Sequence, residues 1–197
     1  GFFLCAVLAQ FAEVARLKGD MSFADRCDVE RTALGQNLEQ HGWDGEWYRR
    51  AYFDDGTPLG SAGNAECQID SIAQSWSVLS GAGDPVRSRA AMDALDARLV
   101  RRDDALVRLL APPFDTSALD PGYIKGYVPG VRENGGQYTH AAIWAAMAFA
   151  ELGDATRAWD VWRLINPVAH GASPEAIERY KLEPYVVAAD VYAADPH

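Results

Sequence analysis

Residues 1–20 read GFFLCAVLAQFAEVARLKGD, and this opening stretch decides the fold. Phe3, Val7 and Phe11 recur at four-residue steps, which places their side chains on one stripe of a helix. The Gly-Asp pair that closes the stretch is typical of a helix end followed by a turn. The pattern therefore predicts an amphipathic helix over residues 1–17 that buries one face against other helices.

Polar residues interrupt this first helix at Gln10, Glu13 and Arg16. A bilayer span needs about 20 consecutive, predominantly apolar residues, so the stretch is too short and too polar to cross a membrane. It also has neither a basic leader nor a small-residue cleavage site, so it does not read as a signal peptide. We therefore expect a helix of a protein core.

Working outward, the same helical period recurs in pairs along the chain. Each pair is joined by a turn that contains glycine and aspartate. Ser22 is the predicted cap of the second helix in the first pair, while Asp84 and Asp154 are predicted to open the second helix in the other two. The predicted pairs are residues 1–17 with 23–40, 70–79 with 85–100, and 138–152 with 155–165. Two shorter helices are predicted, one beginning at Ser173 and one spanning residues 184–193.

The segments between the pairs have a different composition. Residues 46–53 are rich in aromatics and end at a turn of Asp, Gly and Thr, which predicts a short β-hairpin. Residues 59–68 read as a loop, and residues 106–110 read as a short strand. The chain from residue 113 to 137 is one long loop rich in glycine and proline, and a loop of that length in a compact domain is usually functional.

Helical hairpins that alternate with long aromatic loops are typical of an α/α toroid, in which inner helices line a central well. The predicted fold class is all-α: a partial (α/α)6 toroid, with about three of six hairpins, a short β-hairpin excursion and long loops. Residues 1–197 are expected to form the C-terminal part of a single catalytic domain that continues beyond both ends. A helical bundle explains the helices equally well but not the long loops, because bundles use short connections.

Composition narrows the classes of function. The net charge of the 197 residues is −10, and the 18 basic residues are scattered, which argues against a nucleic-acid partner. An acidic chain suits a neutral ligand. Cys5, Cys27 and Cys67 are odd in number and match no metal knuckle, so we expect a reducing, cytoplasmic compartment. The four histidines lie far apart, so neither a zinc site nor another cofactor is predicted.

The densest group of polar residues lies in residues 123–140, YIKGYVPGVRENGGQYTH. Glycines let a backbone approach a ligand closely, carboxylate and amide groups bond sugar hydroxyls, and aromatic rings offer flat faces to a pyranose. His140 lies just inside a predicted helix start, where the helix dipole favours an anion. The alternative is a solvated loop with an Arg132–Glu133 surface ion pair, and for His140 an ordinary helix-start histidine.

Three smaller clusters carry further candidates. Trp43 belongs to the segment WDGEW, which reads either as a sugar platform with a carboxyl acid or base or as a staple between hairpin and helix. Gln74 and Trp76 lie on one predicted helix but cannot share a face at a two-residue spacing, and core packing is the default for the Trp. Glu183 precedes a proline and either closes the well or caps the next helix.

These segments together resemble glycoside hydrolase family 94, formerly glycosyltransferase family 36. That family includes cellobiose and chitobiose phosphorylases, 1,2-β-oligoglucan phosphorylases and the C-terminal domain of cyclic β-1,2-glucan synthase. Within the family, this sequence is most similar to the β-1,2-glucan branch. The Glu-Asn-Gly-Gly block with its following His is the most specific part. The matching residues are 43–48, 72–81, 122–127, 132–140 and 180–185.

The resemblance implies an inverting enzyme that cleaves a β-glucosidic bond with inorganic phosphate and releases α-glucose 1-phosphate. It implies phosphate at His140 and sugar at Glu133. The family's general acid lies in a Gly-Asp-Trp-Asn-Asp-like segment that these residues do not contain, so no catalytic residue is assigned and the fragment alone is expected to be inactive. The candidate sugar-binding residues are Glu133, Arg132, Asn134, Lys125, Gln74, Trp76, Trp43 and Glu183.

The resemblance also sets the expected partners: a β-glucan oligosaccharide, phosphate, the rest of the same polypeptide and a second copy in a homodimer. A cytoplasmic domain of an inner-membrane synthase is the expected setting if the chain belongs to such a synthase. Two alternatives stay open. One is a non-catalytic sugar-binding or scaffolding module of a glucan synthase. The other is a hydrolase on the same toroid, which would need a second carboxylate to activate water and would not need His140 for phosphate.

Overall fold

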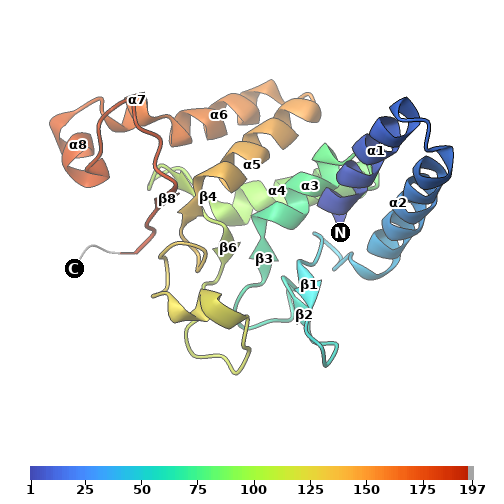
Figure 1. The fold of residues 1–197 in the computed structure, drawn as a ribbon. Helices are drawn as coiled ribbons and strands as arrows, with labels where there is room; N and C mark the ends of the chain where they lie inside the picture. The colour runs from blue at the N-terminus through green and yellow to red at the C-terminus, as the bar shows by residue number, and fades with distance from the viewer. Residues whose placement is uncertain (195–197) are drawn as a thin grey trace.

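The computed structural model describes residues 1–194, and helices dominate it. Figure 1 shows α1 and α2 side by side and projecting from the rest, while α3 to α6 form the body of the molecule. The prediction of an all-α fold built from helical hairpins is confirmed. The helices are α1 (Phe2–Leu17), α2 (Met21–His41), α3 (Ser71–Leu79), α4 (Pro85–Leu99), α5 (Thr139–Glu151), α6 (Ala155–Ile165), α7 (Pro167–His170) and α8 (Pro174–Tyr180).

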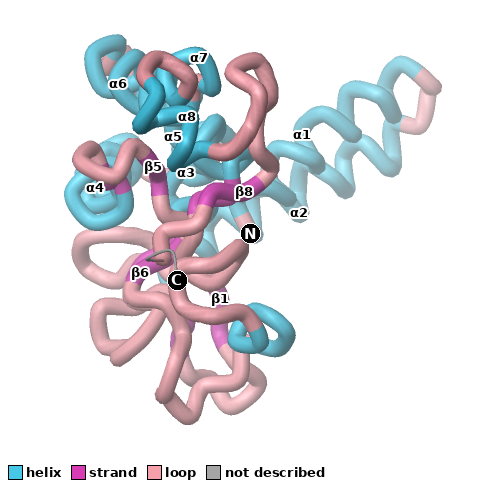
Figure 2. The backbone as a smooth tube through the Cα atoms, turned by 90° about the vertical axis from the view of Figure 1, so that its left-hand side faces the viewer, coloured by secondary structure: helices cyan, strands magenta, loops and turns pink. Residues whose placement is uncertain are grey.

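The strands are all two residues long and pair antiparallel in four separate ladders. Figure 2 shows that most of the loops and strands gather at one end of the helices. The β-hairpin predicted after residue 46 is confirmed, and the predicted strand at 106–110 is two short strands. The ladders are β1 (Ala51–Tyr52) with β2 (Pro58–Leu59), β3 (Ile69–Asp70) with β6 (Leu110–Ala111), β4 (Val100–Arg101) with β5 (Leu106–Val107), and β7 (Gln137–Tyr138) with β8 (Asp190–Val191).

Aspartates start the second helix of every pair. The turn composition predicted this for Asp84 and Asp154, but α2 begins at Met21 with Asp20 as its cap, so the predicted cap Ser22 is wrong. The Asp20 carboxylate accepts from Phe23 N at 3.0 Å, and the Asp84 carboxylate accepts from the first turn of α4. Asp154 accepts from Arg157 N at 3.0 Å. Each such cap contributes about 0.5–2 kcal/mol, because it satisfies an N–H that has no partner inside the helix.

The main core lies where α3, α4 and α5 meet, and it includes Met92, Leu95 and Phe149, all essentially inaccessible to solvent. The inner face of α5 is built from alanines, of which Ala145 and Ala148 are fully buried. Small side chains let two helices pack closely, so α5 contacts α3 on one side and α6 on the other. This packing fixes where α5 begins.

The predicted helix over residues 184–193 is wrong. Lys181 ends α8 in the left-handed conformation with φ +55°, and residues 184–185 form a turn. The following residues are extended, and Asp190–Val191 form β8. Their backbone groups bond the loop before α5, for example Ala193 N to Gly130 O at 2.8 Å, and this tertiary pairing outweighs local helix propensity.

Gln74 of α3 joins the aromatic excursion to the helical core. Its side chain is fully buried, its Oε1 accepts from Tyr48 N at 2.8 Å, and its Nε2 donates to Tyr48 O at 2.8 Å and to Asp70 O at 2.9 Å. The geometry gives the predicted sugar contact of Gln74 no support, because both polar atoms of its buried amide bond backbone groups. Its function is to satisfy a buried stretch of backbone that has no strand beside it.

No helix among residues 1–194 is long and apolar enough to cross a membrane. In the same part of the chain, no group of three or more His, Cys, Asp or Glu side chains gathers in a way that could hold a metal ion. The three cysteines Cys5, Cys27 and Cys67 are buried and unpaired.

The first test concerns Gln74. Gln74→Ala leaves Tyr48 N and Tyr48 O buried without partners, so we expect the free energy of unfolding to fall by about 2–4 kcal/mol. Urea unfolding followed by circular dichroism measures it. Gln36→Ala, on the exposed face of α2, is the matched control and should change stability by less than about 0.5 kcal/mol. Equal stability of the two variants would contradict the assignment.

Candidate functional site

The candidate site lies at the end of the molecule where α1, α3 and α5 begin. Figure 1 shows the N-terminal ends of these three helices facing the same side as the loops that carry β1, β2 and the segment before β7. Helix N-termini carry the positive end of the helix dipole and unpaired N–H groups, so this end suits a negatively charged ligand. The polar cluster at residues 123–140 is placed here by the start of α5.

Asn134 organises this loop from inside. Its side chain is fully buried, its Oδ1 accepts from Phe114 N at 2.7 Å, and its Nδ2 donates to Phe114 O and to Tyr127 O, each at 2.8 Å. The geometry gives the predicted sugar contact of Asn134 no support, for the same physical reason as that of Gln74. The amide joins three segments of backbone and leaves the neighbouring side chains to face outward.

The two glycines after Asn134 are required by packing within the loop. A Cβ on Gly135 would lie 2.9 Å from Pro113 Cβ, and Gly135 has a φ of +85°. A Cβ on Gly136 would lie 2.8 Å from Arg132 O. The Glu-Asn-Gly-Gly block is therefore a tight turn in which no other residue fits, which is a different reason from the ligand approach that the sequence suggested.

Arg132 is held in a conformation that few non-glycine residues adopt, with a φ of +50°. Its guanidinium lies 5.4 Å from the centre of the Tyr127 ring, and its Nε lies 3.7 Å from Glu133 Oε2. A hydrogen bond to Tyr138 and the nearby negative charges, including Asp190, raise the pKa of Arg132 above its ordinary value. Backbone strain of this kind concentrates at functional sites, so it marks Arg132 as a ligand candidate.

Glu133 lies between this arginine and the aromatic side of the loop. Its Oε1 accepts from Tyr123 OH at 3.4 Å, and its charge raises the pKa of that tyrosine. Its Oε2 is buried and has no hydrogen-bond partner among residues 1–194. Arg132, Glu133 and Tyr123 therefore form one polar group, with Tyr123 itself largely exposed.

His140 is the second residue of α5 and is exposed to solvent. Its ring meets the Tyr138 ring edge-on at 4.8 Å and the Trp144 ring edge-on at 4.8 Å. Trp144 in turn packs edge-on against Trp76 at 5.3 Å. The imidazole is thus fixed by two aromatic neighbours and open on its remaining side. Trp76 takes the packing role that the sequence left open.

Lys125 lies in the 3-10 helix η1 (Gly122–Gly126) and holds the loop beneath it. Its Nζ donates to Ser117 O and, at 3.2 Å, to Leu119 O. The structure uses Lys125 to fix loop carbonyls, and its sugar contact stays a prediction. Glu183 is exposed, and its carbonyl accepts from Val186 N at 2.9 Å, so it closes a turn and caps no helix. A sugar contact by Glu183 stays a prediction.

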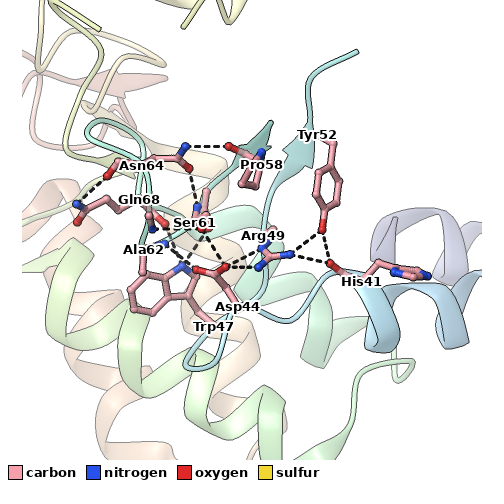
Figure 3. A network of polar contacts seen from close by, with 12 residues as sticks. His41, Asp44, Trp47, Arg49, Tyr52, Pro58, Ser61, Ala62, Asn64 and Gln68 are labelled. Atoms are coloured by element: carbon pink, nitrogen blue, oxygen red, sulfur yellow. Dashed lines mark hydrogen bonds and ion pairs between the residues drawn. The ribbon is translucent and has the colours of Figure 1, made fainter. Parts of the chain in front are cut away.

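The aromatic cluster at residues 43–48 has a structural role, because it holds neighbouring segments of the chain together. Figure 3 shows Asp44 at the centre of a polar network, in ionic contact with Arg49 at 2.6 Å and accepting from Ser61 Oγ and Ala62 N. Trp47 is buried and donates from Nε1 to Gly60 O and Gln68 O at 3.0 and 2.9 Å. These bonds tie residues 42–49 to residues 60–68 and occupy Asp44 fully.

Trp43 shares this structural role. The Arg87 guanidinium lies 5.3 Å from the centre of one Trp43 ring, and Tyr48 meets Trp43 edge-on at 5.0 Å. Trp43 packs against the main core and pairs with Tyr48 in an isolated bridge. Of the two alternatives for this cluster, the geometry supports the staple, and a sugar contact by the partly buried Trp43 stays a prediction.

The role of Glu66 was not predicted from the sequence. Its carboxylate holds the long loop at residues 113–137. Glu66 is only 8% exposed, and its Oε1 accepts from Thr116 N at 2.8 Å and from Ser117 N at 3.1 Å. Burial by itself raises the pKa of Glu66, but the hydrogen bonds from Ser117 and Thr116 outweigh it and hold the pKa at about 2. A single acid in a polar loop gives no sequence signal of such a contact.

The aromatic neighbours of His140 were missed for a similar reason. Tyr138 reaches His140 only because β7 runs directly into α5, and Trp144 reaches it because residues four apart share a helix face. The His140–Trp144 spacing could have been read from the predicted helix. The contact with Tyr138 could not, because it depends on the backbone direction at the helix start.

The model of the glycosyl hydrolase 94 superfamily catalytic domain matches residues 1–197. The chain belongs to this family. It is 55% identical over 192 residues to the cyclic β-(1,2)-glucan synthase NdvB of Rhizobium meliloti (strain 1021), which covers 98% of the chain and 7% of the synthase. It is 32% identical over 180 residues to the N,N'-diacetylchitobiose phosphorylase of Vibrio furnissii, covering 90% of the chain and 22% of that enzyme.

A third relative is the solabiose phosphorylase of Paenibacillus borealis, which is 33% identical over 134 residues, 68% of the chain and 17% of the enzyme. The chain thus spans less than a quarter of the length of each of these relatives. The family confirms the resemblance found in the sequence and the α/α toroid expected from it. The glycosyl hydrolase 94 assignment applies to all of the segments described above.

Glu66 gives a pH-dependent test of the loop anchor. Its folded pKa of about 2 lies below the ordinary 4.5, so its contribution to stability is complete above pH 4.5 and is lost as the pH falls toward 2. We expect Glu66→Gln to lower the free energy of unfolding at pH 7 by about 1–3 kcal/mol, with the difference from wild type shrinking below pH 4.5. Urea unfolding across pH measures this. A constant difference down to pH 2 would contradict it, and exposed Glu13→Gln is the control.

Asn134 gives a test that separates loop structure from sugar contact. Asn134→Ala leaves Phe114 N and Phe114 O buried without partners, so we expect a loss of about 2–4 kcal/mol in the free energy of unfolding. Urea unfolding measures it, and Asn37→Ala on the exposed side of α2 is the control. Unchanged stability together with weaker sugar binding would restore the sequence prediction.

Proposed function

We propose that the chain is part of an inverting phosphorylase-type enzyme that cleaves a β-linked glucan with inorganic phosphate and releases α-glucose 1-phosphate. The observation that carries the proposal is the exposed imidazole of His140 at the start of α5, beside the strained Arg132–Glu133 turn. The family supports the reaction class, since the relatives are named as phosphorylases and a glucan synthase. The name of the synthase supports the β-1,2 linkage.

In this proposal His140 binds phosphate. Three features favour an anion there: the imidazole is open on one side, the α5 dipole presents its positive end, and Arg132 lies on the adjoining loop. Phosphate replaces water as the nucleophile at the anomeric carbon. The leaving oxygen needs a proton from a general acid, and Asp44 is not assigned that role because it is committed to Arg49, Ser61 and Ala62.

Glu133 binds the glucose ring next to the phosphate. Its buried Oε2 lacks a donor within residues 1–194, and a sugar hydroxyl is a donor of the right size to approach it after a small shift of the loop. Tyr123 and Tyr127, which meet edge-on at 6.2 Å, offer apolar faces for the ring that leaves. A neutral glucan fits the acidic chain, whose net charge is −10.

The wider assembly follows from the same proposal. Residues 1–197 form the C-terminal part of one (α/α)6 catalytic domain, and the rest of that domain supplies the general acid. The buried, unpaired state of Cys5, Cys27 and Cys67 supports a reducing, cytoplasmic setting. Phosphate is the co-substrate and no other cofactor is proposed. A homodimer remains part of the proposal without a surface assigned to it.

The test replaces His140 in an intact catalytic domain that contains this chain. We expect His140→Ala to reduce the phosphate-dependent release of glucose 1-phosphate from β-1,2-glucan by about 10²-fold, mainly by raising the KM for phosphate, because a ligand of the reacting anion is lost. The matched control is His41→Ala, an exposed histidine at the end of α2. Glucan cleavage that continues without phosphate would instead establish a hydrolase, and glucan binding without any cleavage would establish a scaffolding module.

A further inference from the structure

A segment near the C-terminal end of the described residues lies across the candidate site. Residues 186–193, called here the C-terminal strap, pair with the loop and with the helix start. Ala193 N donates to Gly130 O at 2.8 Å, Thr139 N donates to Ala189 O at 2.9 Å, and Asp190 lies opposite Tyr138 in the β7–β8 ladder. The strap therefore bonds the residue immediately before His140.

The strap is held at its other end by Tyr180, the last residue of α8. The Tyr180 hydroxyl donates to Val186 O at 3.2 Å and accepts from Ala188 N at 3.2 Å. Its ring stacks on His170, with the ring centres 4.6 Å apart and the planes 8° from parallel. His170 Nε2 lies 2.7 Å from Leu164 O, so the stack is fixed to the end of α6.

These contacts form one continuous path. It runs from Leu164 through the His170–Tyr180 stack to the strap backbone, and from Ala189 O to Thr139 N at the first turn of α5. Every step is a hydrogen bond or a ring contact between neighbouring groups, with no gap filled by a flexible side chain. The end of α6 and the start of α5 are the two ends of one antiparallel hairpin, so the path fixes the open end of that hairpin.

We propose that Tyr180 is a positioning residue for His140 and acts through the strap. This inference rests on the proposed function, in which His140 binds phosphate. The hydroxyl fixes the backbone on both sides of residue 187, and this holds Ala189 O in place to accept from Thr139 N. Because Thr139 is the first residue of α5, its backbone sets where the next residue, His140, points. The motif RYKLEPY at residues 179–185, which also holds the predicted sugar contact Glu183, thus gains a positioning function at Tyr180.

The inference distinguishes positioning from general stability. Loss of the hydroxyl should loosen the strap and the helix start while leaving the α3–α5 core intact, since Tyr180 lies outside that core. A positioning role predicts weaker use of phosphate at nearly unchanged kcat. A merely structural role predicts a smaller fraction of active protein, which lowers the apparent kcat and leaves KM unchanged.

The experiment compares Tyr180→Phe with Tyr185→Phe in an intact catalytic domain that contains this chain. Tyr185 is the matched control because it lies five residues away and is 79% exposed. We expect Tyr180→Phe to raise the KM for phosphate by about 3- to 10-fold, the change that follows from losing a neutral hydrogen bond. We expect amide hydrogen exchange of peptides that contain Thr139 and Ala188 to accelerate by a similar factor, and the control to match wild type in both.

A second variant covers the case in which Tyr180→Phe folds poorly. His170→Phe keeps a flat ring beside Tyr180 but removes the bond to Leu164 O, so it should raise the same KM and accelerate the same exchange. Wild-type values of KM and exchange in either folded variant would overturn the inference, and so would a lower kcat alone. If the wild-type domain shows no phosphate-dependent cleavage, the proposed function fails, and the exchange rates alone then decide whether Tyr180 fixes the helix start.

Discussion

Three buried carboxamides, Gln74, Asn134 and Gln137, supply the hydrogen bonds that neighbouring strands supply in a sheet. Each is almost inaccessible to solvent, and each bonds backbone groups of a distant segment: Gln74 bonds Tyr48, Asn134 bonds Phe114, and Gln137 Oε1 accepts from Val107 N at 2.8 Å. Buried backbone N–H and C=O groups must have partners, and the strands here are only two residues long. An amide is suited to this because it both donates and accepts.

This arrangement explains how a helical protein can carry long loops in fixed positions. The amides tie the excursion at residues 43–68 and the loop at residues 112–138 to the helical body, and Glu66 and Lys125 tie the second loop to itself and to the excursion. The side chains that face outward include Arg132 and His140. Their positions are fixed by the backbone that carries them and not by hydrogen bonds of their own to the core. The loops that carry part of the site are thus held in fixed positions by bonds to their own backbone groups.

Much of the fold was readable from the sequence. The three helical hairpins, the aspartates that start α4 and α6, and the hairpin at residues 51–59 follow from period, capping and turn chemistry, all of which are local. The conformation of residues 184–193 could not be predicted from the sequence, because it is set by pairing with Gly130 and Tyr138, which are far away in the sequence. Among the site residues, Gln74, Asn134 and Lys125 were chosen for their chemistry, and each is committed to backbone groups of another segment.

The sequence by itself determined the family, the helical architecture and the cluster of residue types between Tyr123 and His140, since these depend on composition and spacing along the chain. Only the tertiary structure decided which polar side chains stay open to solvent and which hold loops. In the sequence, an amide side chain that binds a ligand cannot be distinguished from one that holds a loop. Its role depends on whether a buried backbone group lies within hydrogen-bonding distance of it. The amide and the backbone group that it bonds are 20 to 30 residues apart in the sequence, as in the Asn134–Phe114 and Gln74–Tyr48 pairs. A local sequence pattern therefore cannot predict the contact.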